Sequence, residues 1–405
     1  MKTDTDKFLA NIYGYAFFNS LTLLSPVYAV FMSEHGMSDF MVSSLLMLWP
    51  VGVLLTQIPL SSVANRIGAR LTLVLGQILK IAAFILWILW PCYLGFAIGM
   101  LMWGAHGAIY NVIGEDVLYS HMNTHTNTAA YTRALGRRKN YHTFGAILSS
   151  FGSLLLFFGY GWITAASILA LAISITFIIR MKFDDTQKIK NTNFIASMRT
   201  GFRVVIQTPA IFAMMTICVM ATNFSYLNDY LGLIGIGVGL PREFIGALPL
   251  AMMMCQMLGQ GIAHRFTKMN GMWLYIALGG AGMLFMLFAL FYNIWALIAI
   301  GVAYIICAVV KVILYSRFQD RVPAKFRLEI LSIYNLADQF MYMIVCIIIG
   351  MGGIMGGWQN GIMILGTLLL GCGLTAALFV RHGGIQRLNK YIARTTIRPD
   401  GAPRF

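Results

Sequence analysis

Long apolar stretches separated by short polar breaks run along almost the whole chain. A helix needs about 20 mostly apolar residues to cross the hydrocarbon core of a bilayer. The pattern therefore predicts twelve membrane-spanning helices, with neighbours antiparallel where the break is short. We expect them at residues 10–33, 40–64, 71–90, 92–116, 141–159, 162–181, 210–233, 244–264, 272–291, 294–316, 328–350 and 358–380.

Composition supports a membrane protein, because 59% of the residues are apolar or aromatic and only 11% are charged. A soluble protein usually has about 25% charged residues. The shortfall excludes a soluble multidomain enzyme, and the apolar content excludes a disordered chain. We therefore expect an all-α, polytopic membrane protein.

Lys and Arg lie mostly on one side of the predicted helices. The termini and the connections that follow even-numbered spans hold 26 of the 29, the opposite side holds Arg242, and Lys80 and Lys311 lie inside spans. Cytoplasmic loops are rich in Lys and Arg, so we expect both termini in the cytoplasm and the protein in a bacterial inner membrane. Topology also accounts for the net charge of +15 without a nucleic-acid partner.

The longest connection divides the predicted helices into two sets of six. We expect residues 1–181 and 210–380 to form one bundle each, residues 182–209 a cytoplasmic linker, and residues 381–405 a basic cytoplasmic tail that touches anionic lipid. The linker includes an amphipathic stretch from Phe194, which is either a helix on the inner leaflet or a plain connection.

Short sequence matches between the halves indicate an internal repeat. Val117-Leu118-Tyr119-Ser120 reappears as Ile313-Leu314-Tyr315-Ser316, 196 residues later, at the end of the corresponding helix. Asn65-Arg66 after the second span has a counterpart in His264-Arg265 after the eighth. Such matches at near-equal offsets predict two bundles related by a pseudo-two-fold axis.

The connection after the second span carries the most specific motif. Asn65-Arg66-x-Gly68-x-Arg70 resembles the signature Asp-Arg-x-Gly-Arg-Lys of the major facilitator superfamily, with Asn65 in place of Asp. The resemblance implies two six-helix bundles that work by alternating access, with this loop latching them on the cytoplasmic side. It assigns gating roles to Asn65, Arg66, Gly68 and Arg70.

Polar side chains at membrane depth are candidates for function, because an ionisable group there costs several kcal/mol unless it is paired or hydrated. Lys80 is central in its helix and is either part of a structural ion pair, with Asp338 as one possible partner, or part of the transport pathway. The family resemblance implies that helices one, four, seven and ten line the cavity. The resulting substrate-binding candidates are Tyr13, Phe17, Asn19, Lys80, His106, Tyr110, Asn223, Tyr226, Asp229, Tyr304, Lys311 and Asp338.

The repeat places Glu115 at the position of Lys311. These opposite charges are either a gate that opens when Glu115 is neutralised or a static pair at the rim. Protons are the simplest coupling ion, with Asp229, Glu115, Asp338 or His106 as carriers.

Twenty-six methionines raise the alternative of a copper or metal-chelate transporter, since thioethers suit Cu(I) and Met253-x-x-x-Met257 has a suitable spacing. Met is also a common packing residue, and we assign no metal ligands and no cofactor. No P-loop or hydrolase motif occurs, so we do not expect an enzyme. The sequence favours a monomeric secondary transporter, a symporter or antiporter, for a small organic solute, anionic or amphipathic; a non-transporting sensor or scaffold on the same fold is a further alternative.

Overall fold

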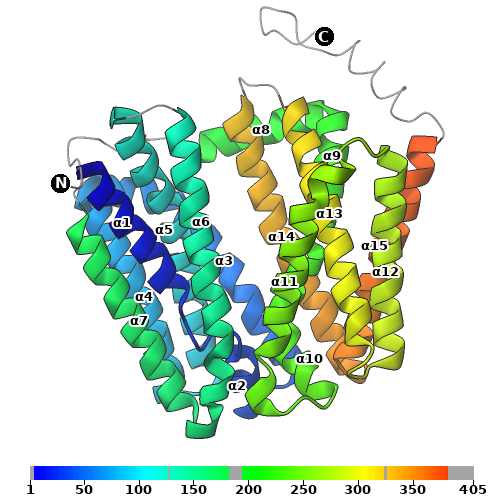
Figure 1. The fold of residues 1–405 in the computed structure, drawn as a ribbon, viewed down its shortest axis with the longest axis horizontal. Helices are drawn as coiled ribbons and strands as arrows, with labels where there is room; N and C mark the ends of the chain where they lie inside the picture. The colour runs from blue at the N-terminus through cyan, green and yellow to red at the C-terminus, as the bar shows by residue number, and fades with distance from the viewer. Residues whose placement is uncertain (1–3, 126–127, 182–193, 323–325, 382–405) are drawn as a thin grey trace, which may run out of the picture. The chain divides into compact units, whose positions relative to one another are not determined.

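The computed structural model describes residues 4–125, 128–181, 194–322 and 326–381. These residues form helices and connecting turns, with no strand among them (Figure 1). Eleven of the described helices are long and apolar enough to cross a membrane. The all-α, polytopic fold class predicted from the sequence is confirmed.

The chain forms two compact units. Unit 1 comprises Met1–Phe194 and Asp229–Leu250, and unit 2 comprises Ile195–Asn228 and Ala251–Phe405. The main helices of unit 1 are α1 (Asp4–Ser20), α2 (Tyr28–Glu34), α3 (Asp39–Ile67), α4 (Ala69–Leu89), α5 (Tyr93–His125), α6 (Thr128–Ser149), η1 (Ser150–Phe158), α7 (Tyr160–Arg180), α10 (Leu231–Gly237) and η3 (Arg242–Phe244). Those of unit 2 are α8 (Phe194–Gln207), α9 (Pro209–Met220), η2 (Asn223–Tyr230), α11 (Ala247–Ile262), η4 (Ala263–Phe266), α12 (Gly271–Phe291), α13 (Leu297–Arg321), α14 (Arg327–Ile354) and α15 (Trp358–Arg381). Of these, α8, η2 and α11 cross the division between the units.

The first predicted span is broken. The stretch 10–33 contains α1 and α2, with turns over residues 21–27 between them. Pro26 lacks a backbone N–H and disfavours a helical conformation at Ser25. This crossing is absent from the eleven candidate membrane spans, and its two pieces leave helix ends inside unit 1 that need polar partners.

The fifth predicted span begins earlier than expected, at Thr128 in α6 rather than at residue 141. The apolar pattern reports which residues face lipid, whereas the backbone hydrogen bonds continue through polar residues. The basic run Arg137-Arg138-Lys139, which the sequence placed in a loop, therefore lies on a helix.

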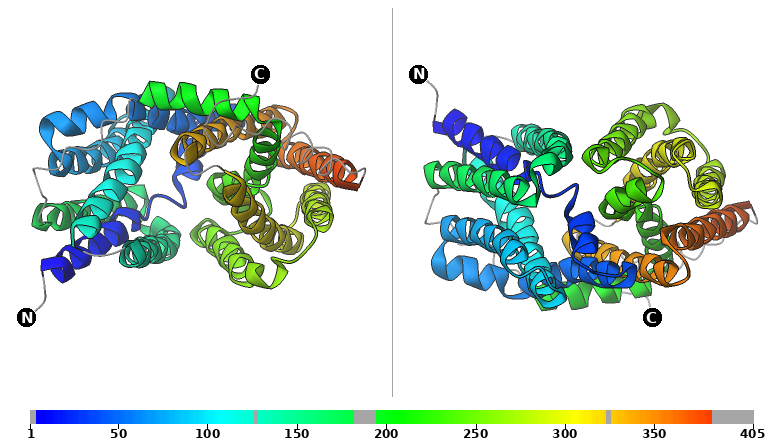
Figure 2. Two further views of the ribbon diagram at one scale, coloured as in Figure 1. Left: turned by 90° about the horizontal axis from the view of Figure 1, so that it is seen from above. Right: turned by 90° about the horizontal axis from the view of Figure 1, so that it is seen from below.

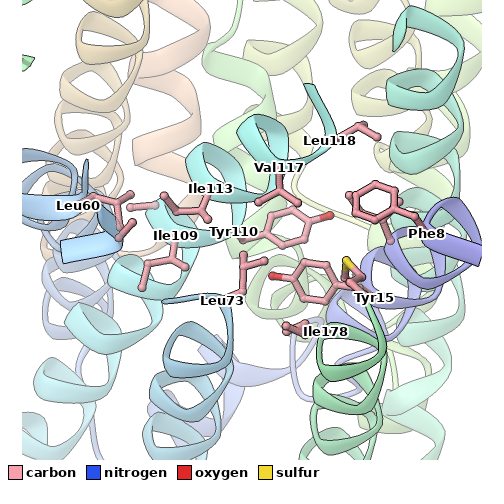
Figure 3. Close-up of a cluster of buried hydrophobic side chains, with 14 of the residues drawn as sticks. Phe8, Tyr15, Leu60, Leu73, Ile109, Tyr110, Ile113, Val117, Leu118 and Ile178 are labelled. Atoms are coloured by element: carbon pink, nitrogen blue, oxygen red, sulfur yellow. The ribbon is translucent and has the colours of Figure 1, made fainter. Parts of the chain in front are cut away.

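A cluster of buried apolar side chains holds the helices of unit 1 together (Figure 3). Phe8 and Tyr15 of α1, Leu73 of α4, Ile113 of α5 and Ile178 of α7 meet in it. Lipid is as apolar as these side chains, so close packing rather than water exclusion favours their association.

Glycines permit close approach of helices in both units. A Cβ on Gly104 of α5 would lie 2.2 Å from the carbonyl oxygen of Trp49 on α3, and one on Gly282 of α12 would lie 2.6 Å from that of Gly366 on α15. The end-on views of the helices show α12 and α15 as neighbours (Figure 2). Small residues at such contacts are the usual means of tight helix packing in membranes.

Residues 229–250, which the sequence assigned to the second bundle, cluster with unit 1. The Tyr230 hydroxyl donates to Ser43 Oγ at 3.2 Å, and Ser153 Oγ donates to the Glu243 carbonyl at 2.8 Å. The 3₁₀ segment η2 makes this division possible, because it interrupts the seventh span between α9 and α10. The bundle boundaries expected from the sequence stay a prediction.

Candidate functional site

The break in the first span is closed by a buried lysine. Lys80 of α4 is only 4% exposed, and its Nζ donates to the Asn19 carbonyl at 3.0 Å. Gln77, one turn earlier, donates from Nε2 to Asn19 Oδ1 at 2.9 Å. Because α1 ends at Ser20, the ammonium lies at the negative end of this helix. Lys80 therefore satisfies a helix end.

Aromatic rings complete the surroundings of Lys80. Its Nζ lies 5.6 Å from the ring centroid of Trp103 and 6.0 Å from that of Phe84. Both distances are within the range of a cation–π interaction. Structure thus brings the candidates Asn19 and Lys80 together around the end of α1, while a pairing of Lys80 with Asp338 stays a prediction.

His106 and Tyr110 of α5 are both buried in unit 1. His106 Nδ1 lies 3.1 Å from the Gly76 carbonyl oxygen, and its ring centroid is 6.2 Å from that of Tyr110. Since the carbonyl can only accept, the His106 nitrogen facing it carries the proton. This geometry fits a packed, hydrogen-bonded histidine.

Sequence reasoning missed Arg138 of α6. It is 3% exposed, its Nη2 donates to the Tyr110 carbonyl at 3.0 Å, and its guanidinium carbon lies 4.6 Å from the Tyr110 ring centroid. It passes over Gly114, where an added Cβ would be 2.6 Å from Nη2. The only signal in the sequence was Gly114, because a glycine leaves room for a large neighbouring side chain.

Tyr13 and Phe17 lie on the face of α1 that meets α6 and α7. Tyr13 stacks on Tyr141 with ring centroids 5.2 Å apart, and Phe17 packs against Phe144 at 5.9 Å. Tyr13 and Tyr141 line a cavity of about 550 Å³ together with Asp6 and Arg137. These two candidates therefore belong to a separate aromatic surface of unit 1.

Unit 2 holds a second group of candidates, which we name the aspartate cluster: Tyr226, Asn228, Tyr304, Lys311 and Asp338. The Tyr304 hydroxyl donates to Asn228 Oδ1 at 3.0 Å, and the Tyr226 hydroxyl donates to the main-chain oxygen of Asp338 at 2.9 Å. Tyr226 also packs against Tyr342, with centroids 4.9 Å apart. The cluster forms where α9 and η2 run beside α13 and α14.

The carboxylate of Asp338 has an unsatisfied oxygen. Its Oδ1 is buried and has no hydrogen-bond partner in the described part of the chain. Lys311 on α13 is near enough for its charge to act on Asp338, but no ion pair within 4.0 Å joins them. A buried carboxylate with an open oxygen can take up a proton or a donor group of a ligand.

The signature loop has the geometry of a tight turn between α3 and α4. Gly68 has a φ of 86°, which residues with a Cβ rarely adopt. Arg70 Nη2 donates to the Met181 carbonyl at 3.0 Å, at the end of α7, whereas Arg66 and Asn65 are exposed. The loop thus bonds a helix end within unit 1, and its gating role stays a prediction.

Other candidates are not brought into these groups. Asp229 is assigned to unit 1, and the side chain of Asn223 lies outside the described residues. Glu115 is in unit 1 and Lys311 in unit 2, so their gate stays a prediction.

The alternative of a metal transporter with Met and His ligands stays a prediction. Within residues 4–125, 128–181, 194–322 and 326–381, no three His, Cys, Asp or Glu side chains gather as a metal site would require. Met257 of α11 is 46% exposed, and His264 Nδ1 lies 2.7 Å from the Gly261 carbonyl oxygen.

Comparisons with known proteins agree on one family. A family model described as Major Facilitator Superfamily matches residues 11–344. Among solved structures, the nucleoside transporter NupG is similar with a TM-score of 0.70 and 10% identity, covering 92% of this chain and 98% of its own. A D-xylose-proton symporter gives 0.69 and 12%, covering 92% and 96%. The POT family transporter PepTSo gives 0.70 and 10%, covering 95% and 99%. A search of curated proteins gives no match.

Proposed function

Because the chain belongs to the major facilitator superfamily, we propose that it moves a small organic solute across the membrane by alternating access, coupled to protons. The family and the transporters of the same fold support secondary transport rather than enzymatic catalysis. The proposal places the protein in an inner membrane with both termini in the cytoplasm, as its Lys and Arg distribution predicts.

The open carboxylate oxygen of Asp338 carries the proton-coupling part of the proposal. A carboxylate inside a membrane protein is costly unless it is paired, hydrated or protonated. Tyr226 bonds the main chain of Asp338 and leaves Oδ1 available. Asp338 can therefore hold a proton in one state of the transport cycle and release it in another. One protein of the same fold is a D-xylose-proton symporter, which agrees with such coupling.

Lys311 carries the preference for an anionic group. It faces the same cluster as Asp338 without a direct ion pair, whereas the Lys80 ammonium is occupied at the end of α1. We therefore place Lys311, Tyr304 and Asn228 at the solute and assign Lys80 a structural role. A solute carboxylate or phosphate would bind Lys311 most favourably while Asp338 is protonated, because the competing negative charge is then absent.

Transport in proteoliposomes tests the proposal. Solutes that raise the thermal stability of the purified protein are first selected from a panel of carboxylates, pentoses, nucleosides and short peptides. At a pH difference of about one unit, one proton per solute stores about 1.4 kcal/mol and supports about tenfold accumulation. We expect Asp338→Asn to abolish this accumulation and to retain solute exchange, since exchange needs no net proton movement.

Asp320→Asn is the matched control, because Asp320 is an exposed carboxylate near the end of α13 in the same unit. It should accumulate solute as the unchanged protein does. Accumulation by Asp338→Asn at the unchanged level would contradict Asp338 as the proton carrier. Absence of exchange with every stabilising solute would contradict transport and favour the sensor alternative.

A further inference from the structure

We propose that a cavity of unit 2, enclosed by α9, α12, α13 and α15, binds an anionic phospholipid of the cytoplasmic leaflet. In this site the phosphate lies at Arg317 and Arg321 and an acyl chain lies along the apolar wall. The cavity is separate from the aspartate cluster, since none of the five residues of that cluster lines it. The inference does not depend on which solute the protein transports.

The size and wall of the cavity fit an acyl chain. Its volume is about 680 Å³, within the range of cavities that hold a ligand of several hundred daltons. Phe212, Ile217, Tyr275 and Leu314 supply apolar surface from three helices. An acyl chain that moves from the bilayer into this cavity leaves one apolar environment for another that is equally apolar. The headgroup must therefore supply the preference for one lipid over another.

Two arginines supply that selectivity. Arg317 and Arg321 both line the cavity, and no Asp or Glu is among its lining residues. Arg317 Nη2 donates to the Thr267 carbonyl at 3.0 Å, which holds the side chain in place. Among the described residues, the hydrogen-bond partner of Arg321 Nη1 is the thioether of Met214 at 3.2 Å, and a thioether is a weak acceptor. The Arg321 guanidinium therefore keeps donors for a phosphate, which it suits geometrically.

A helix end adds to the positive field at the same place. Asn270 and Gly271, at the start of the 21-residue α12, also line the cavity. The N-terminus of a helix carries partial positive charge and unsatisfied N–H groups. Asn270 caps this end only through a 3.4 Å contact of Oδ1 with the Met272 N–H.

The depth of these groups in the membrane matches the depth of a phospholipid headgroup. Arg321 ends α13 and Gly271 begins α12, so both lie at the ends of membrane spans. The Lys and Arg distribution assigns these ends to the cytoplasmic side. That leaflet holds the anionic lipids, which attract basic groups near the surface.

Charge disfavours one other occupant, the chain's own C-terminal segment. Residues 382–405 contain five Lys or Arg and one Asp, so a basic cavity repels them. The 550 Å³ cavity of unit 1 differs in the same respect, because Asp6 and Arg137 bring both signs of charge to it. We infer no anion site there.

Native mass spectrometry of the full-length protein tests the site, with phosphatidylglycerol and phosphatidylcholine added in equal amounts. We expect preferential retention of phosphatidylglycerol. Arg321→Gln should weaken this retention about five-fold, the effect of one basic group at the membrane surface. Ala376→Trp, which fills the cavity wall, should also weaken it. A photoreactive acyl chain should crosslink to residues 212–217 or 372–376.

Arg265→Gln is the matched control, because Arg265 is an exposed arginine of unit 2 that does not line the cavity. Equal loss of retention in this control and in Arg321→Gln would overturn the site in favour of diffuse surface attraction. Displacement of the lipid by soluble glycerol phosphate would contradict a lipid as the natural ligand and would indicate a soluble organic phosphate instead. Crosslinks confined to other helices would also overturn the proposal.

Discussion

Unit 1 and unit 2 each hold a charged side chain within a membrane span, buried in unit 1 and half-buried in unit 2, and they treat it differently. In unit 1 the Lys80 ammonium donates to the Asn19 carbonyl and faces two aromatic rings. In unit 2 the Asp338 carboxylate keeps an unbonded oxygen, with Lys311 near it but not in contact. A charge that is bonded to a helix end stabilises the fold, whereas a carboxylate oxygen left open remains available for a proton or ligand.

The difference originates in how each unit breaks its helices. The break after Ser20 exposes carbonyl groups at a helix end, and a cation is the favourable partner for such an end. At η2, the side chains of Tyr226 and Asn228 bond groups on neighbouring helices instead. Depth in the membrane alone therefore does not identify a functional charge.

The two lysines provide the largest expected effect on stability. Lys80→Ala leaves the Asn19 carbonyl without its donor and opens a cavity, so we expect a loss of about 3 kcal/mol in the free energy of unfolding. Lys311→Ala removes a side chain without a bonded partner in the described residues and should cost about 1 kcal/mol while impairing transport. Denaturant unfolding of the purified variants measures both. Equal losses would remove the distinction between the units.

We expect glycine substitutions at helix contacts to lower the stability of the two units by similar amounts, in contrast to the two lysine substitutions. We expect Gly104→Ala in unit 1 and Gly282→Ala in unit 2 each to cost about 2 kcal/mol, because the new Cβ meets backbone atoms of the facing helix. Gly280→Ala is the control: nothing lies within 4 Å of its Cβ position. This control should raise stability by up to about 1 kcal/mol, because alanine is more favourable than glycine inside a helix. Thermal unfolding in detergent would reveal a contrary ranking.

The smallest expected effect concerns the attachment of residues 229–250 to unit 1. Arg242 pairs with Glu34, and the Tyr160 hydroxyl also donates to Glu34 at 2.8 Å. The Arg242 side chain is 54% exposed, so we expect Arg242→Gln to cost less than about 1 kcal/mol. The cost should shrink in about 1 M salt, which screens exposed charges.

Arg133→Gln, at another exposed arginine of unit 1, should not alter stability measurably. A loss in Arg242→Gln that persists at high salt would indicate that the pair acts through packing rather than through charge.

Much of the fold could be predicted from the sequence because the bilayer imposes a strong pattern. Eleven of the expected spans coincide with membrane-length helices, and the turn at Gly68 lies where the signature predicts it. The fifth helix began too late in the prediction because apolarity reports lipid contact rather than helix length. The family resemblance is confirmed by the family model.

The sites could be predicted only in part. Tyr226, Tyr304 and Asp338 were recognisable as polar residues in apolar helices, and the structure bonds Tyr226 to Asp338 and Tyr304 to Asn228. Arg138 was missed, since a basic run near a predicted loop is typical of topology and gave no sign of burial.

The sequence by itself determined the number of apolar segments, the asymmetry of charge and the family, because these properties follow from the chain's composition along its length. Tertiary structure alone decided which buried charges are satisfied. Whether Lys80 meets a helix end, and whether Asp338 keeps an open oxygen, depends on groups tens of residues away. Hydrogen bonds act only at contact distance, so partner choice is settled by packing in three dimensions.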